Sequence, residues 1–315
     1  MSVLRCVLLG AGNFGRHYAR LLQTIEGVAL ESVVVHQSAA GDVRAALGIP
    51  SAIEVSTDAA AALGSSRYDC AIIATSPATH FALAEEALAR GMHVLVEKPM
   101  VTSVEDARAL AHAAEISGKV CMVGYQYLFH DAIRYIREEL IERGVRFTHL
   151  FVEHALSPPR PDVNVLWDVA PHALSILHYL FGAPRIGAVH GSLRAQEGGT
   201  LPGTVAMTMC TENGPSLTLA SSWYGREKKR RLTFLGEGMR VLFDESLAGG
   251  PLLICRDGVA PQVPAFDARE PLRRELDHFF ACARSGARPL TDVSFGRRIT
   301  EELAELESRL DVCAF

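Results

Sequence analysis

The feature that most constrains the fold is a glycine-rich turn near the start of the chain, Gly10-Ala11-Gly12-Asn13-Phe14-Gly15. It follows an apolar run from Val3 to Leu9 and opens a helical pattern. In a G-x-G-x-x-G turn with these flanks, the first glycine permits a tight turn, the second lets a pyrophosphate approach the backbone, and the third allows close packing of helix on strand. An ordinary turn is the alternative for the motif alone, but the flanks favour dinucleotide binding. The expected contacts are Gly10, Gly12, Asn13, Phe14, Gly15 and Arg16.

The form of the dinucleotide stays open. An acidic residue about 20 positions after such a turn usually accepts the ribose hydroxyls of NAD. This chain has His36-Gln37-Ser38 there, so no carboxylate repels a 2′-phosphate, and Arg16 beside the turn could pair with one. The alternative is that Arg16 is a solvated helix residue and His36 ends a strand. We therefore expect NAD or NADP, with His36 on the ribose side.

The order of the predicted elements indicates two domains. Up to about Gly124, short apolar runs alternate with helical patterns, which is typical of a doubly wound parallel sheet. Beyond it, strand-like stretches predominate and helices are few. The sequence predicts an α/β Rossmann domain over 1–123. It predicts an α+β domain for substrate binding and oligomerisation over 124–315, with a large, open, mostly antiparallel sheet.

The composition limits which kinds of molecule the protein is expected to bind. The 315 residues are 49% hydrophobic and 21% charged, with a net charge of −5, so no general attraction to nucleic acid or an anionic membrane is expected. No apolar run is long enough to cross a bilayer. The seven cysteines are scattered without a CxxC pair, unlike a disulfide framework or a zinc site. We expect reduced thiols, no metal, a cytoplasmic location and a small-molecule substrate.

Two pairs of ionisable residues are candidates for a catalytic site. Glu97 and Lys98 end a buried strand, the edge at which open parallel sheets bind ligands, although a salt-bridged surface lysine is the commoner reading of such a turn alone. Asp168 and His172 lie four apart on one helix face, and Pro171 is predicted in the first turn. By themselves these two residues read as a helix cap and a buried histidine.

Several motifs taken together resemble the Gfo/Idh/MocA family of oxidoreductases, nearest to its sugar and nucleotide-sugar dehydrogenases. The resemblance spans nearly the whole chain. It rests on the glycine turn and on Ala74-Thr75-Ser76-Pro77-Ala78-Thr79-His80, Glu97-Lys98-Pro99, Trp167-Asp168-Val169-Ala170-Pro171-His172 and Pro271-Leu272-Arg273-Arg274-Glu275-Leu276. Some relatives carry an acidic residue three positions after the histidine, where this chain has Ser175, so the fine substrate contacts are in doubt.

The resemblance implies hydride transfer between a nicotinamide and a carbon bearing a hydroxyl in a sugar, cyclitol or nucleotide sugar. It places Lys98, Asp168 and His172 at the reacting hydroxyl, with Lys98 and His172 as candidates for proton transfer. It further implies coenzyme contacts from Thr75, Ser76, Pro77, His80, Glu97 and Lys98, and a cis bond between Lys98 and Pro99.

Other candidates have plainer alternatives. Tyr125, Gln126, Tyr127 and His130 follow the last Rossmann strand and are expected either at the substrate or in packing. Arg160, in a Pro-rich loop, either contacts a charged substrate or is solvated. The basic run from Arg226 to Arg231 is interpreted as a solvated hairpin.

Two other functions compete with the dehydrogenase. One is a dinucleotide-binding sensor without turnover, although a sensor needs none of Lys98, Asp168 and His172. The other is reduction of a conjugated non-sugar substrate, which would not depend on His172. The open second sheet predicts a homodimer or homotetramer.

Overall fold

The computed structural model describes residues 3–36, 43–155, 159–195, 201–267 and 269–313. Its contacts divide the chain into two units, Met1–Gly124 with Leu272–Glu301 and Tyr125–Pro271 with Glu302–Phe315. The prediction assigned all of 124–315 to the second domain. In the structure, helix α8 (Pro271–Ser285) and the first half of α9 (Val293–Arg309) belong almost wholly to the first unit. The apolar face of α8, which includes Phe279 and Phe280, is fully buried.

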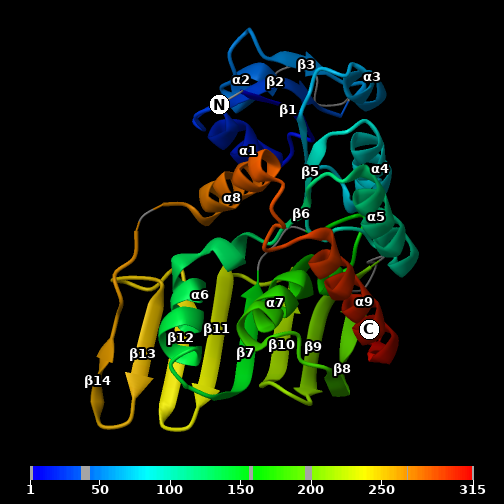
Figure 1. Ribbon diagram of the computed structural model, residues 1–315. Helices are drawn as coiled ribbons and strands as arrows, with labels where there is room; N and C mark the ends of the chain where they lie inside the picture. The colour runs from blue at the N-terminus through cyan, green and yellow to red at the C-terminus, as the bar shows by residue number, and fades with distance from the viewer. Residues whose placement is uncertain (1–2, 37–42, 156–158, 196–200, 268, 314–315) are drawn as a thin grey trace. The chain divides into compact units, whose positions relative to one another are not determined.

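The first unit is built on a six-stranded parallel sheet in the order β3-β2-β1-β4-β5-β6 (Figure 1). This is the doubly wound arrangement that the alternating pattern predicts, and the prediction is confirmed. The strands are β1 (Leu4–Leu9), β2 (Val28–Val34), β3 (Glu54–Ser56), β4 (Cys70–Ile73), β5 (His93–Glu97) and β6 (Cys121–Gly124). The middle strands β1, β4 and β5 are apolar runs because helices cover both faces of the sheet.

Helices of the first unit flank this sheet. Helix α1 (Gly15–Leu22) lies beside α8, and α4 (His80–Ala89) packs on α5 (Val104–Ser117) (Figure 1). Ser103 caps α5 by accepting the N–H of Asp106 at 3.0 Å, and Gly118 ends that helix in the left-handed conformation. The shorter helices are α2 (Val43–Leu47), α3 (Ala59–Gly64) and η2 (Pro77–Thr79).

The second unit carries a nine-stranded sheet in the order β14-β13-β12-β11-β7-β10-β9-β8-β15. All neighbouring strands are antiparallel except β7 with β10 and β8 with β15, so the predicted open, mostly antiparallel sheet is confirmed. The strands are β7 (Phe147–Ala155), β8 (Ile186–Ala195), β9 (Pro202–Thr211), β10 (Ser216–Ser222), β11 (Lys229–Gly236), β12 (Met239–Asp244), β13 (Leu252–Arg256), β14 (Val259–Gln262) and β15 (Asp311–Cys313).

One face of this sheet is covered by helix. Helix α7 (Val165–Phe181) crosses β9 and β10, and α6 (Asp131–Tyr135) lies on the same face, between η3 (Gln126–Phe129) and the wider helical turn η4 (Ile136–Ile141) (Figure 1). Side chains alternate along each strand, so Leu150 and Val152 of β7 face the helices, while Phe151 lies on the other face. No helix among the described residues has the length and apolar character needed to cross a membrane.

The start of α7 differs from the prediction. The helix begins at Val165, and Asn164 caps it by accepting the N–H groups of Leu166 and Trp167 at 3.0 and 3.3 Å. Pro171 therefore lies in the second turn, not in the first as predicted, and its missing N–H leaves the carbonyl of Trp167 without the usual helical donor. The end is as expected, because Gly182 adopts the left-handed conformation at the C-terminus.

Candidate functional site

In the first unit, three loops that carry predicted site residues leave neighbouring strands. The glycine turn follows β1, the Thr75–His80 segment follows β4, and Glu97-Lys98-Pro99 follows β5. These strands lie side by side and parallel, so their carboxyl ends share one edge of the sheet. Strand β1 is also where the chain changes direction across the sheet, because β2 lies on one side and β4 on the other. Ligands of open parallel sheets bind at such a switch point.

The three glycines of the turn have different surroundings. Gly10 has φ +95°, and a Cβ there would lie 2.5 Å from the carbonyl oxygen of Ala74. A Cβ on Gly15 would overlap the carbonyl oxygen of Gly10, so both glycines are needed for the fold itself. A Cβ on Gly12 would meet no protein atom within 4 Å. The space over Gly12 therefore fits the approach of a coenzyme pyrophosphate to the backbone, as the motif predicts.

The start of α1 is free for an anion. Phe14 occupies the N-cap without a side-chain hydrogen bond, and no acidic residue lies in the first turn. The helix N–H groups and the helix dipole favour a phosphate at this point. Arg16 is exposed, and its guanidinium donates to Oδ1 of Asn13 at 2.6 Å, which holds it beside the turn. His36 is also exposed, two residues beyond the end of β2.

His80 connects two of the loops. It is 1% exposed, and its ring nitrogens lie 2.9 Å from the carbonyl oxygen of Pro99 and 3.3 Å from that of Thr75. The histidine thus holds the loop after β4 against the loop after β5. Ser76 is exposed, Thr75 is half-buried and Pro77 is buried. The Lys98-Pro99 bond is cis, as the resemblance implies.

Lys98 is half-buried, whereas Glu97 is 8% exposed. The backbone N–H of Lys98 donates to Oε2 of Glu97 at 3.0 Å, and Oε1 of Glu97 accepts the hydroxyl of Tyr18 at 2.7 Å. The carboxylate of Glu97 therefore anchors the backbone from which the lysine side chain projects.

In the second unit, Asp168 and His172 come from the first half of α7. Asp168 is 8% exposed, and its Oδ2 accepts the indole N–H of Trp223 at 3.1 Å. Arg160 lies with a guanidinium nitrogen 3.9 Å from the other carboxylate oxygen and also pairs with Asp162. The predicted Pro-rich loop thus reaches Asp168, and this arginine balances its charge.

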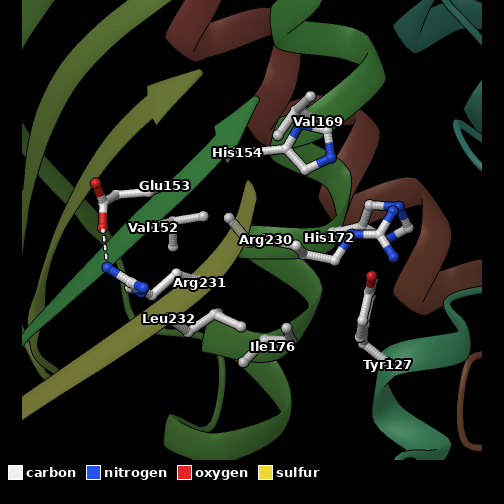
Figure 2. A pocket seen from close by; sticks show the side chains of 11 residues that line it. Tyr127, Val152, Glu153, His154, Val169, His172, Ile176, Arg230, Arg231 and Leu232 are labelled. Atoms are coloured by element: carbon white, nitrogen blue, oxygen red, sulfur yellow. Dashed lines mark ion pairs between the residues drawn. The ribbon is translucent and has the colours of Figure 1, made fainter. Parts of the chain in front are cut away.

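His172 lies in a cluster of polar and aromatic side chains. Its ring meets the ring of Tyr127 edge-on at 4.9 Å between centroids, and the guanidinium carbon of Arg230 is 5.3 Å from the centre of the same tyrosine ring. Burial raises the pKa of Tyr127, and the nearby Arg230 partly opposes that rise. Figure 2 shows His154, Arg230, His172 and Tyr127 around one pocket, and the ion pair between Glu153 and Arg231, the residues next to His154 and Arg230 on the same two strands.

Strand register explains the cluster. Arg230 of β11 pairs directly with His154 of β7, and each lies two residues from a buried side chain of its strand, so both face α7. These side chains line a cavity of about 20 Å³, room for a single water molecule. The interpretation of the basic run as a solvated hairpin is wrong for Lys229 to Arg231, which form the start of β11. Arg230, His154 and Trp223 were missed because only strand pairing brings them to His172 and Asp168.

The other predicted substrate residues differ in their exposure. Tyr125 is 1% exposed, which suits packing better than substrate contact, whereas Gln126 is half-buried. Among the residues that the structure describes, no group of three His, Cys, Asp or Glu side chains is arranged to hold a metal ion.

The fold and the coenzyme cradle define an oxidoreductase that binds NAD or NADP. Residues 4–125 match the model of an oxidoreductase family with an NAD-binding Rossmann fold, and residues 147–241 match that family's C-terminal domain. The chain belongs to the Gfo/Idh/MocA family, which confirms the resemblance.

Two curated relatives match over all or most of the chain. The chain is 28% identical to UDP-N-acetylglucosamine 3-dehydrogenase of Acidithiobacillus ferrooxidans, with 100% of this chain and 99% of the relative covered. It is 27% identical to scyllo-inositol 2-dehydrogenase (NAD(+)) of Bacillus subtilis strain 168, over 92% and 89% of the two chains. A solved structure of the Acidithiobacillus enzyme aligns with a TM-score of 0.83 at 25% identity and covers 99% of both chains.

The glycines provide a test of the coenzyme cradle. We expect Gly12→Ala to leave the melting temperature unchanged, because its Cβ meets no protein atom, and to weaken coenzyme binding about tenfold or more by blocking the pyrophosphate. Gly15→Ala is the matched control, and its overlap with Gly10 should destabilise the fold by about 1–3 kcal/mol. Calorimetry and thermal unfolding measure both effects. Unchanged coenzyme affinity in Gly12→Ala would contradict this site.

Proposed function

We propose that this chain interconverts a secondary alcohol and a ketone on a sugar, cyclitol or nucleotide-sugar substrate, with NAD or NADP as hydride carrier. The observation that carries the proposal is the place of Lys98, at the carboxyl end of β5 and on the same sheet edge as the glycine cradle. The similarity to dehydrogenases of UDP-N-acetylglucosamine and scyllo-inositol, over 100% and 92% of this chain, supports this substrate class.

The coenzyme supplies or accepts the hydride when it is bound. The task of this chain is then to move the proton of the hydroxyl group. The two candidates are the ammonium of Lys98 and the imidazole of His172, a side chain of the type that most often serves as general acid and base. Asp168, held by Trp223 and Arg160, supplies a buried carboxylate one helical turn before His172 and orients the histidine or a substrate hydroxyl.

Lys98 is the residue whose removal tests turnover most directly. We expect Lys98→Met to reduce kcat by a factor on the order of 100 or more, because a positioned proton-transfer group is lost, while coenzyme binding persists. Lys119→Met is the matched control, since Lys119 is also half-buried in the first unit but lies at the start of β6, away from the carboxyl edge. Nicotinamide absorbance over a panel of sugars, cyclitols and nucleotide sugars measures the rates. Full turnover in Lys98→Met would reject its role.

Arg16 is the residue that we propose to favour NADP over NAD. The exposed guanidinium, held by Asn13 beside the turn, suits a 2′-phosphate better than a hydroxyl. We expect Arg16→Ala to lower kcat/KM for NADP about tenfold and leave the value for NAD nearly unchanged. Arg20→Ala, an exposed arginine one turn later on α1, should change neither value. An unaltered ratio of the two coenzymes in Arg16→Ala would contradict the assignment.

We further propose that the chain forms a homodimer or homotetramer through the sheet face opposite α7, in a reducing, cytoplasmic setting. That face carries Phe151, 37% exposed and stacked on His149 at 4.2 Å between ring centroids. Hydrogen bonds between His149 and Thr218 and between Thr218 and Thr208 continue across the strands. All seven cysteines are free thiols, which supports the reducing setting.

Sedimentation tests the assembly. We expect Phe151→Glu to convert the oligomer to a monomer, because a charge would be buried at the centre of the interface. Val312→Glu is the control, since Val312 is 70% exposed on the edge strand β15 and should leave the assembly intact. A wild-type protein that sediments as a stable monomer would refute the proposal.

A further inference from the structure

Two buried carboxyl groups of the first unit share one tyrosine hydroxyl. Oη of Tyr18, on α1, lies 2.7 Å from Oε1 of Glu97 and 3.1 Å from Oε1 of Glu275, on α8. Tyr18 and Glu275 are fully buried, and Glu97 is 8% exposed. The other oxygen of Glu275 makes no hydrogen bond with the described residues. Glu275 is 178 positions away from Glu97 in sequence, and the hydroxyl of Tyr18 links the two carboxyl groups.

The absence of a side chain at Gly124 leaves room for the contact between Tyr18 and Glu97. A Cβ on Gly124, at the end of β6, would lie 3.0 Å from Oε1 of Glu97 and 3.2 Å from Oη of Tyr18. Tyr18 also meets Phe14 of the glycine turn edge-on, at 5.5 Å between ring centroids. The chain of contacts therefore runs from α8 through α1 to the end of β5, where Glu97 accepts the backbone N–H of Lys98.

The number of hydrogens available to the hydrogen bonds of Tyr18 indicates which of the two carboxyl groups is charged. The Tyr18 hydroxyl has a single hydrogen, and the shorter distance gives it to Glu97. The contact between Tyr18 and Glu275 is then favourable only if Glu275 carries a hydrogen of its own and donates it to Oη. Burial raises the pKa of Glu275 well above its ordinary value, and the charge of nearby Glu97 raises it further. The titratable groups that face Glu275 are Tyr18 from α1 and Glu97 from β5.

We propose that Glu275 is a neutral carboxylic acid at physiological pH and the positioning residue for Lys98, in a hydrogen-bond chain from Glu275 through Tyr18 and Glu97 to the Lys98 backbone. The protonation state stands on the buried geometry alone, whereas the effect on turnover rests on the proposed function. Because Glu275 is neutral, the buried pair of Glu275 and Glu97 carries a single negative charge. That charge lies on Glu97, whose carboxylate accepts the backbone N–H of Lys98.

The pH dependence of stability tests the protonation state. Glu275 is neutral in the folded protein but ionises in the unfolded chain above about pH 4.3. Its favourable contribution is therefore complete below that pH and is lost as the pH rises. Glu275→Gln keeps the shape and the donor but cannot ionise. We expect its unfolding equilibrium constant, relative to wild type, to fall by up to tenfold per pH unit between about pH 5 and 8.

Urea unfolding measures this difference, and infrared spectroscopy provides a second readout. The wild-type minus Glu275→Gln difference spectrum at neutral pH should contain the carbonyl band of a protonated carboxylic acid. Asp277→Asn, which alters a half-exposed carboxylate on the same helix, is the control and should give neither effect. A constant stability difference between pH 5 and 8, or a carboxylate band, would overturn the neutral state.

Hydrogen exchange of the Lys98 amide tests the positioning role without any need for turnover. We expect the amide to exchange as slowly in Glu275→Gln as in wild type, and at least tenfold faster in Glu275→Ala and Tyr18→Phe. Where substrate is known, Glu275→Ala should lower kcat with little change in KM for coenzyme, and Glu275→Gln should restore kcat. If Glu275→Ala folds and leaves the exchange of Lys98 unchanged, the positioning role is refuted, whatever reaction the enzyme catalyses.

Discussion

The close contact between the loops after β1 and β4 is the constraint on which the first unit depends. Gly10 turns so near the carbonyl of Ala74 that no side chain fits between them, and a side chain on Gly15 would overlap the carbonyl of Gly10. This contact places the start of α1, which has no side-chain cap and no acidic residue in its first turn, at the switch point of the sheet. The coenzyme cradle is thus a consequence of backbone packing, and only the open position of Gly12 is left for the ligand itself.

Buried polar links extend this constraint to the lysine. His80 joins the backbones of the loops after β4 and β5, and the carboxylate of Glu97 accepts from the backbone of Lys98 and from Tyr18 on α1. Inside a protein such bonds are strong, and an unsatisfied group there is costly, so the network specifies one arrangement. The glycine turn, the histidine and the lysine are thus held at one edge of the sheet, by close packing between the loops after β1 and β4 and by hydrogen bonds between the loops after β4 and β5.

In the second unit, the alternation of side chains along the strands determines which residues surround His172. Arg230 and His154 pair across β11 and β7 and face α7, whereas Phe151 and Thr218 face the opposite side. A shift of one residue in either strand would exchange these two faces. The same register therefore supplies the polar surroundings of His172 and exposes the face that we propose for assembly.

Sequence alone determined the elements whose signals are local. The glycine turn with its flanks, the alternation of strands and helices, and the position of Lys98 after a buried strand are all set by neighbouring residues, and the structure agrees with them. The start of α7 was missed because Asn164, four residues before Asp168, is a cap only when its own backbone is extended, as it is in the structure.

Only the tertiary structure decided which distant side chains meet. Trp223, directly after β10, reaches Asp168 on α7. Arg230 reaches the cluster of Tyr127 and His172 through pairing of β11 with β7, and Glu275 meets Tyr18 257 positions away. No local pattern contains these contacts, since they depend on strand register and on helix packing across long sequence separations. The physical reason is that burial removes these polar groups from water, so each needs a partner inside the protein. Which partner lies within reach depends on the packing of the whole fold.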